Sequence, residues 1–140
     1  MATIRNTITE KDFASKVTKF ENRFSEWYNC YILPAHSGQP LPLTGAFTLL
    51  EDISHDLTEY LNSLSGKRCR AFVERADGTF TSTDLPANIK ILASLADVCN
   101  GLLILLDAMN YKETENQAKD AAVAVAEMVN RDFHNFALAL

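Results

Sequence analysis

The acidic stretch around His55 is the first place where residue types and spacing could support chemistry. Glu51, His55 and Glu59 are four residues apart, so on a helix they share one face, and Asp52 precedes His55 by three residues. Carboxylate-bundle metal proteins place ligands at this three-residue step, but they need a matching motif on a second helix. The sequence has no such motif. We interpret the row as a solvated acidic face and predict no metal site and no cofactor.

Arg131 and His134 form a second candidate, because a helix places them on one face. Asp132 is a candidate ion-pair partner, and a surface pair is the favoured interpretation. The alternative is a metal-dependent hydrolase or nuclease that uses His55 or His134. The sequence contains no G-x-S-x-G elbow, no phosphate-binding glycine loop and no H-E-x-x-H motif. We therefore predict no catalytic residue and a protein that is not an enzyme.

The composition indicates a cytoplasmic globular domain. Cys30, Cys69 and Cys99 are far apart and form no C-x-x-C pair, so neither a disulfide framework nor a zinc site is expected. The net charge of -5 disfavours nucleic acid as a partner. The most apolar run, residues 101–106, is too short to span a bilayer, so no membrane contact is expected.

Hydrophobic periodicity predicts four helices in a single domain, 1–140. Their expected ranges are about 9–33, 44–65, 84–109 and 114–138. Thr9 is the expected N-cap of the first helix, and Pro34 is expected to end it. Thr114 and Gln117 predict a capping box at the start of the last helix.

The third predicted helix is apolar on most of its circumference, which predicts a central position in the bundle. Asp97, Asn100 and Asp107 are spaced along one side of it. If the helix is covered all round, these groups are buried and form a polar pocket. The alternative is a strip that faces water.

Between the second and third helices, residues 67–82 predict a β-hairpin. Small or β-branched residues occupy every second position of the first half, and Asp77-Gly78 is a turn signal. Cys69, Ala71 and Val73 alternate with Arg68, Arg70, Phe72 and Glu74. The predicted fold is therefore mainly α, a four-helix bundle with a β-hairpin inserted between helices two and three.

The predicted hairpin concentrates arginine and aromatic residues, which interface hot spots favour. Arg68, Arg70, Phe72 and Phe80 are the predicted partner-binding residues. The alternatives are ion pairs with the acidic second helix of the same or a twin subunit, and a β-ribbon that enters a nucleic-acid groove.

The leading functional hypothesis is a non-catalytic, dimeric, protein-binding regulator of inhibitor, antitoxin, immunity or adaptor type, which masks or bridges a protein partner. Its second expected contact surface is the acidic row of Glu51, Asp52, Asp56 and Glu59. The alternative is a sensor or sequestering protein for a small ligand, with a pocket between helices one and three and the 34–43 loop as its lid. The residues expected to line that pocket are Trp27, Tyr28, Tyr31, His36 and Asn100.

Overall fold

A computed structural model describes the backbone of residues 7–65, 68–69, 72–74, 80–82 and 85–140. Side chains are described for residues 8–65 and 85–140. The observations below concern these residues.

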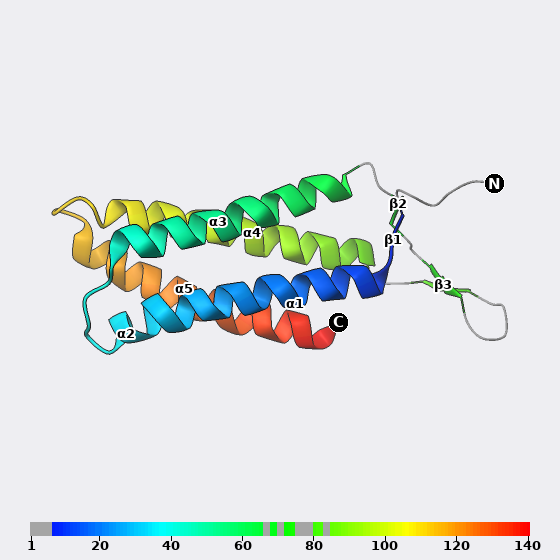
Figure 1. Cartoon of the computed structure of the whole chain (residues 1–140), viewed down its shortest axis with the longest axis horizontal. Helices are drawn as coiled ribbons and strands as arrows, with labels where there is room; N and C mark the ends of the chain where they lie inside the picture. The colour runs from blue at the N-terminus through cyan, green and yellow to red at the C-terminus, as the bar shows by residue number, and fades with distance from the viewer. Residues whose placement is uncertain (1–6, 66–67, 70–71, 75–79, 83–84) are drawn as a thin grey trace.

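Four long helices form an antiparallel bundle in which each helix runs opposite to the one before it (Figure 1). They are α1 (Glu10–Trp27), α3 (Leu43–Leu64), α4 (Leu85–Ala108) and α5 (Glu115–Ala139). α4 packs on α3 and α5, and α1 packs on the same two helices from the other side. The mainly α prediction is confirmed, and the predicted ranges of the last three helices agree with the structure to within one residue at each end.

The first helix begins where its sequence predicts. Thr9 is extended, and its side-chain oxygen accepts a hydrogen bond from the backbone N–H of Asp12 at 3.2 Å. Ile8 and Phe13 flank this cap and are both buried. The cap therefore satisfies one of the free N–H groups of the first turn, and the apolar pair secures the chain as it enters the helix.

The prediction that Pro34 ends the first helix is wrong, because α1 ends at Trp27 and helical backbone continues past the proline. A π-helical turn, η1 (Tyr28–Ile32), follows α1, and the short helix α2 (Leu33–His36) continues through the proline. In the wider turn, the N–H of Leu33 donates to the carbonyl of Tyr28. A proline ring presses on the carbonyl four residues earlier in a regular helix, and the π turn immediately before it accommodates that group.

The capping box predicted for the last helix is also wrong. The Thr114 hydroxyl donates to the carbonyl of Ala108 at 2.6 Å and makes no side-chain cap on α5. Its backbone has helical rather than extended angles, with φ -115° and ψ -3°. The hydroxyl therefore turns back toward the end of α4 and closes the connection between the two helices.

The hairpin predicted over residues 67–82 is wrong as a single inserted ribbon. β2 (Arg68–Cys69) pairs in parallel with β1 (Thr7–Ile8), which precedes α1. Among the described residues of the remaining part, two three-residue strands, β3 (Phe72–Glu74) and β4 (Phe80–Ser82), pair antiparallel. The local residue pattern predicted one continuous first strand for the hairpin. Such a pattern cannot show that Arg68–Cys69 pair with a distant segment, Thr7–Ile8.

The core of the bundle is aromatic on the α1 side and aliphatic on the α4 side. Phe24 of α1 lies 5.3 Å from Trp27 and 6.2 Å from Phe133 of α5, measured between ring centroids. The fully buried side chains of α3 and α4 are mainly leucine. One polar contact crosses between these two helices, because the buried Ser54 hydroxyl donates to the side-chain oxygen of Asn100 at 2.6 Å.

Candidate functional site

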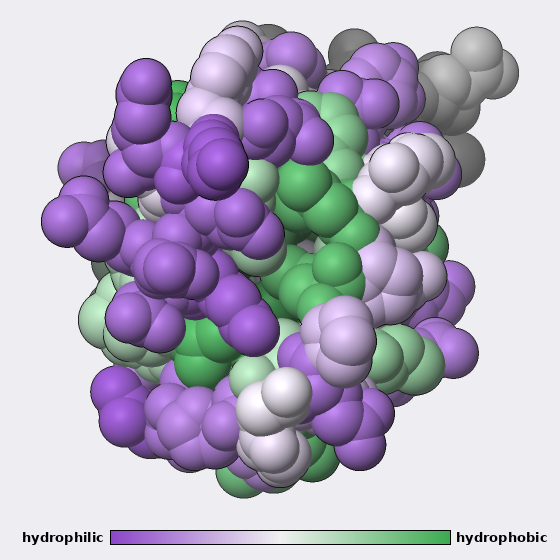
Figure 2. All heavy atoms as spheres, turned by 90° about the vertical axis from the view of Figure 1, so that its left-hand side faces the viewer, coloured by the Kyte–Doolittle hydropathy of each residue, from purple (hydrophilic) through white to green (hydrophobic). Residues whose placement is uncertain are grey.

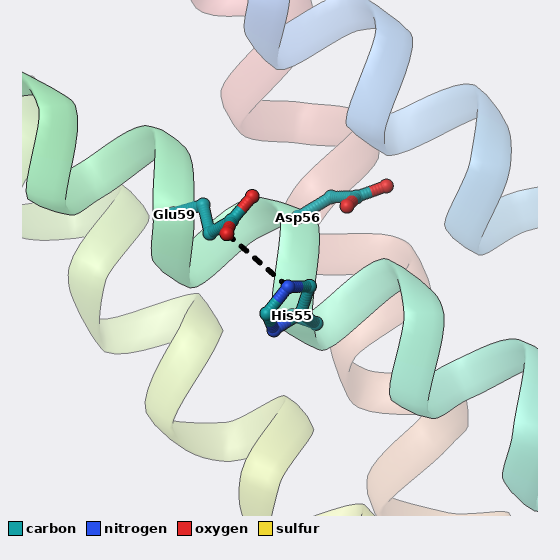
Figure 3. Close-up of side chains that lie close together, drawn as sticks. All are labelled: His55, Asp56 and Glu59. Atoms are coloured by element: carbon teal, nitrogen blue, oxygen red, sulfur yellow. Dashed lines mark ion pairs between the residues drawn. The ribbon is translucent and has the colours of Figure 1, made fainter.

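The His55 cluster is the only group of three potential metal ligands among the residues whose side chains are described. Ligand atoms of His55, Asp56 and Glu59 lie within 4.8 Å of one another, but all three residues are exposed. Figure 3 shows Glu59 facing the His55 ring, at 3.2 Å from Nε2, while Asp56 extends toward α1. There its carboxylate accepts a hydrogen bond from Arg23 at 2.8 Å. The cluster is therefore two surface ion pairs, which contribute about 0–1 kcal/mol each.

The acidic row predicted as a second contact surface is solvent-exposed along α3. Glu51, Asp52, Asp56 and Glu59 are all exposed, as an acidic outer face requires. Two of the four carboxylates already have partners within the chain, Asp56 with Arg23 and Glu59 with His55. The Arg23 guanidinium therefore offsets the charge of one carboxylate of the row, Asp56.

The side chains of the predicted hairpin contact residues lie outside the described part of the chain. Arg68, Phe72 and Phe80 are placed only as backbone, in β2, β3 and β4 respectively. Arg70 lies outside the described residues altogether.

The structure does not bring the five predicted ligand-binding residues together. Trp27 is fully buried, and its Nε1–H donates to the carbonyl of Ala46 at 2.8 Å, so it belongs to the core between α1 and α3. Tyr28 and Tyr31 are half-buried in η1. Partial burial and the negative charge of Glu127 on α5 both raise the pKa of Tyr28.

His36 and Asn100, the other two residues of that prediction, face different parts of the surface. His36 lines an open groove of about 480 Å³ between α2 and α5, together with Lys119, Asp120 and Glu127. Asn100 is exposed on α4 and accepts the hydrogen bond from Ser54 of α3. These side chains therefore do not jointly line the predicted pocket between the first and third predicted helices, which are α1 and α4.

Arg131 and His134 take different partners. The Nε of Arg131 lies 3.7 Å from the carboxylate of Asp132, a surface ion pair. The Nδ1 of His134 lies 3.1 Å from the carboxylate of Glu21 on α1. The side chain of Glu21 is only 11% exposed. The sequence interpretation missed this pair because 113 residues separate its members.

α4 is less covered than its composition predicts. Its buried residues lie on one side, toward α3 and α5. Ile91 is 45% exposed and Ile104 is 71% exposed, although both are large and apolar. The predicted central position is therefore wrong. The polar residues Asp97, Asn100 and Asp107 are all exposed, so they form a strip at the surface rather than a buried pocket.

An uncharged strip runs along the uncovered part of α4, and we call it the α4 strip. Its members follow one another at alternating steps of four and three residues, the spacing that keeps one face of a helix toward a partner helix. Larger and small side chains alternate along the strip, and each of the two sets repeats every seven residues. The larger set is Ile91, Val98 and Leu105, and the small set is Ala87, Ser94, Gly101 and Ala108. Each of these seven residues is exposed or half-buried.

Length and composition alone would also allow α4 to cross a membrane, and only 33% of its most apolar stretch is buried in the molecule. The same test is passed by core helices of soluble proteins. The longest uninterrupted apolar run, on which the sequence prediction of no membrane contact rested, did not reveal this property of the whole helix.

A second apolar area lies at one end of the bundle. Figure 2 looks onto the end formed by α2, the start of α3 and the connection from α4 to α5, and shows apolar side chains gathered within a hydrophilic surround. Leu33, at 46%, and Tyr111, at 61%, are the large exposed apolar residues of this region. A groove of about 190 Å³ lies there, lined by Phe47 of α3 and Asp107 of α4 among others.

Comparisons with protein-family models, with curated proteins and with solved structures find no match to this chain.

Proposed function

We propose that this chain is a non-catalytic, protein-binding regulator that contacts its partner through the uncovered face of α4. One observation carries the proposal. α4 is apolar enough to be a core helix, yet only 33% of its most apolar stretch is fully buried, and the rest of that stretch is half-buried or exposed. An apolar helix face of this length is unfavourable in water and is typical of a surface that another protein covers.

The energetic gain from covering this face is substantial. Complete burial of an isoleucine side chain contributes about 1.5–3 kcal/mol. Ile91 and Ile104 are thirteen residues apart, so their side chains point about 140° apart around α4. Both expose about half of their surface or more, and a partner that reached both would gain on the order of 2–3 kcal/mol from these two residues. Ile91 belongs to the α4 strip and is its hot-spot candidate, and Ile104 borders the strip.

A protein fits this face better than a lipid bilayer does. Asp97 stands near the midpoint of α4 and is exposed, and a charged residue at the centre of a bilayer costs about 2.5–3.5 kcal/mol or more. α3, which packs beside α4, exposes four carboxylates along its length. A membrane that covered α4 would have to accommodate these charges, whereas a protein surface can leave them at a polar rim.

The proposal of a non-catalytic role draws support from how the ionisable groups are arranged. In the described part of the chain, His55 and Asp56 occupy surface ion pairs, and His134 binds a carboxylate of the neighbouring helix. Cys99 is fully buried, and burial raises the pKa of its thiol to about 12, which keeps it protonated and unreactive.

Site-specific photo-crosslinking in the cells that naturally contain the protein tests the proposal. A photoreactive phenylalanine analogue replaces Ile91 or Ile104 in the full chain, and Leu33, with the same exposure as Ile91, is the matched control. We expect protein adducts from positions 91 and 104 that are absent from position 33. Equal adducts at all three positions, no protein adducts, or adducts to lipid alone would overturn the proposal.

A further inference from the structure

We propose that the partner of the α4 strip is the α4 strip of a second copy of this chain, packed antiparallel across a two-fold axis. This inference rests on the proposed function, since it names the partner of the same face.

The order of large and small residues makes the strip complementary to itself in the antiparallel direction. When Val98 lies opposite the second copy's Ser94, the seven-residue repeat places Ile91 opposite its Gly101 and Leu105 opposite its Ala87. Each larger side chain then enters a space left by a small one, the pattern that lets two helices interlock closely. The two-fold axis repeats every contact, as an interface between identical surfaces requires.

A parallel arrangement has no such match. There, Ile91 would face Ile91 and Gly101 would face Gly101, so the larger side chains would hold the helices apart and leave gaps at the small residues. Packing therefore selects the antiparallel orientation.

The area of the strip fits a weak dimer. Residues 87–108 span about 32 Å, and a helix of this length is about 10–12 Å wide. The contact area of the strip is then on the order of 400 Å² on each copy. The neighbouring surfaces of α3 and α5 increase this area. A total of roughly 1,000 Å² lies at the lower end of specific interfaces, so we expect dissociation in the micromolar range.

Electrostatic repulsion disfavours contact between two copies through their acidic faces and leaves the α4 strip as the favoured face. The chain carries a net charge of -5, and α3 exposes a row of carboxylates, so two copies repel each other in most orientations. The seven residues of the α4 strip carry no charge, and the charged residues that border the strip on α4, Lys90 and Asp97, have opposite signs. Added salt screens the repulsion between the copies, so the dimer should become tighter as ionic strength rises, whereas an interface held by ion pairs would weaken.

The decisive variant is Gly101→Gln. A Cβ atom at position 101 meets nothing within 4 Å in the chain itself, so a side chain can begin there without a clash in the monomer. Replacing glycine within a helix also favours folding, because glycine loses the most backbone freedom there. In the dimer, the same side chain fills the space that Ile91 of the second copy needs. We expect the variant to fold at least as stably as the wild type and to self-associate at least tenfold more weakly. Thr58→Gln, at an exposed position on α3, is the control and should leave self-association unchanged.

Sedimentation equilibrium of the purified full chain, from the low micromolar to the high micromolar range, measures this self-association. A monomer–dimer equilibrium that Gly101→Gln weakens and Thr58→Gln does not is the expected result. A dimer that Gly101→Gln leaves intact would overturn the inference. Orientation is read from disulfide formation between Ser94→Cys and Val98→Cys chains lacking Cys30 and Cys69. Mixed chains should cross-link better than either alone, and the reverse would exclude the antiparallel pair.

The two proposals fail in distinguishable ways. A chain that stays monomeric throughout, while positions 91 and 104 still crosslink to a different protein, would overturn the second copy as partner and leave the protein-binding function standing. A monomer with no crosslinks from either position would overturn both.

Discussion

The ring of His134 on α5 lies 3.1 Å, from Nδ1 to Oε1, from the carboxylate of Glu21 on α1. An ionised carboxylate can only accept hydrogen bonds, so the tautomer of His134 that carries a proton on Nδ1 donates to Glu21. Glu21 is one of two polar or charged side chains buried within the described part of the chain, and His134 supplies its hydrogen-bond partner. The pair therefore fixes α5 against α1 at a level of the bundle where both helices otherwise pack through phenylalanines.

Removal of His134 should destabilise the protein more than removal of an exposed histidine. His134→Ala leaves the buried Glu21 carboxylate without this partner, which costs about 1–3 kcal/mol in the free energy of unfolding. His55→Ala is the matched control, because it breaks only an exposed pair with Glu59 and should cost less than about 0.5 kcal/mol. Urea unfolding followed by circular dichroism measures both values. Equal losses in the free energy of unfolding would show that the buried contact of His134 stabilises the protein no more than an exposed pair does.

Cys99 should make the protein lose stability above about pH 9. Burial raises the pKa of its thiol from 9.0 to about 12. Between these values the unfolded chain releases the proton and the folded chain keeps it, so the contribution of Cys99 to stability is complete below pH 9 and falls as the pH rises. The slope is about 1.4 kcal/mol per pH unit. Cys99→Ala should lack this component, and the difference between the two unfolding curves at pH 8 and pH 10 measures it.

Trp27→Phe should lower stability through a lost hydrogen bond and a smaller core side chain. The indole N–H donates to the Ala46 carbonyl at 2.8 Å, and the ring is fully buried. We expect a loss of about 2–4 kcal/mol. Tyr111→Phe, at a residue that is 61% exposed, should change stability by less than about 0.5 kcal/mol. Thermal or urea unfolding followed by circular dichroism compares the two, and a loss below 1 kcal/mol for Trp27→Phe would contradict the assigned contact.

The effects of substitutions at Gly45 and Tyr31 on the free energy of unfolding should depend on each other. A Cβ atom at position 45 would lie 3.1 Å from the Tyr31 hydroxyl, which is tighter than an ordinary contact. The methyl of Gly45→Ala therefore displaces that ring and offsets the gain from a better helix former. In a Tyr31→Phe background, the nearest ring carbon is 3.5 Å away, so the same substitution should stabilise by about 0.5–1 kcal/mol. A double-mutant cycle measures the coupling. Purely additive effects would contradict it.

The helices and their buried faces follow from local sequence. The stripe from Phe13 to Trp27 repeats at steps of three and four residues and is buried as the period requires. Thr9 caps α1 as predicted, because an N-cap depends on residues only three positions apart. Four amphipathic helices of this length can cover their apolar faces only by packing together, and so the mainly α bundle was predictable.

The sequence did not determine the features that depend on which segments meet. Nothing near Pro34 signals the π turn that carries the helix through it. β2 pairs with β1, which lies some sixty residues earlier in the sequence, whereas β3 pairs with β4. In the sequence nothing distinguishes Glu21 from a surface glutamate. Only the packing of α5 on α1 places His134 beside it.

The candidate site shows the same division most clearly. The sequence by itself determined that α4 is apolar on most of its circumference, because hydropathy is a property of each residue. Only the tertiary structure decided that α3 and α5 cover one side and leave Ile91 and Ile104 exposed, because coverage depends on where the other helices lie. α4 therefore keeps one side uncovered in this chain, although its composition is that of a core helix.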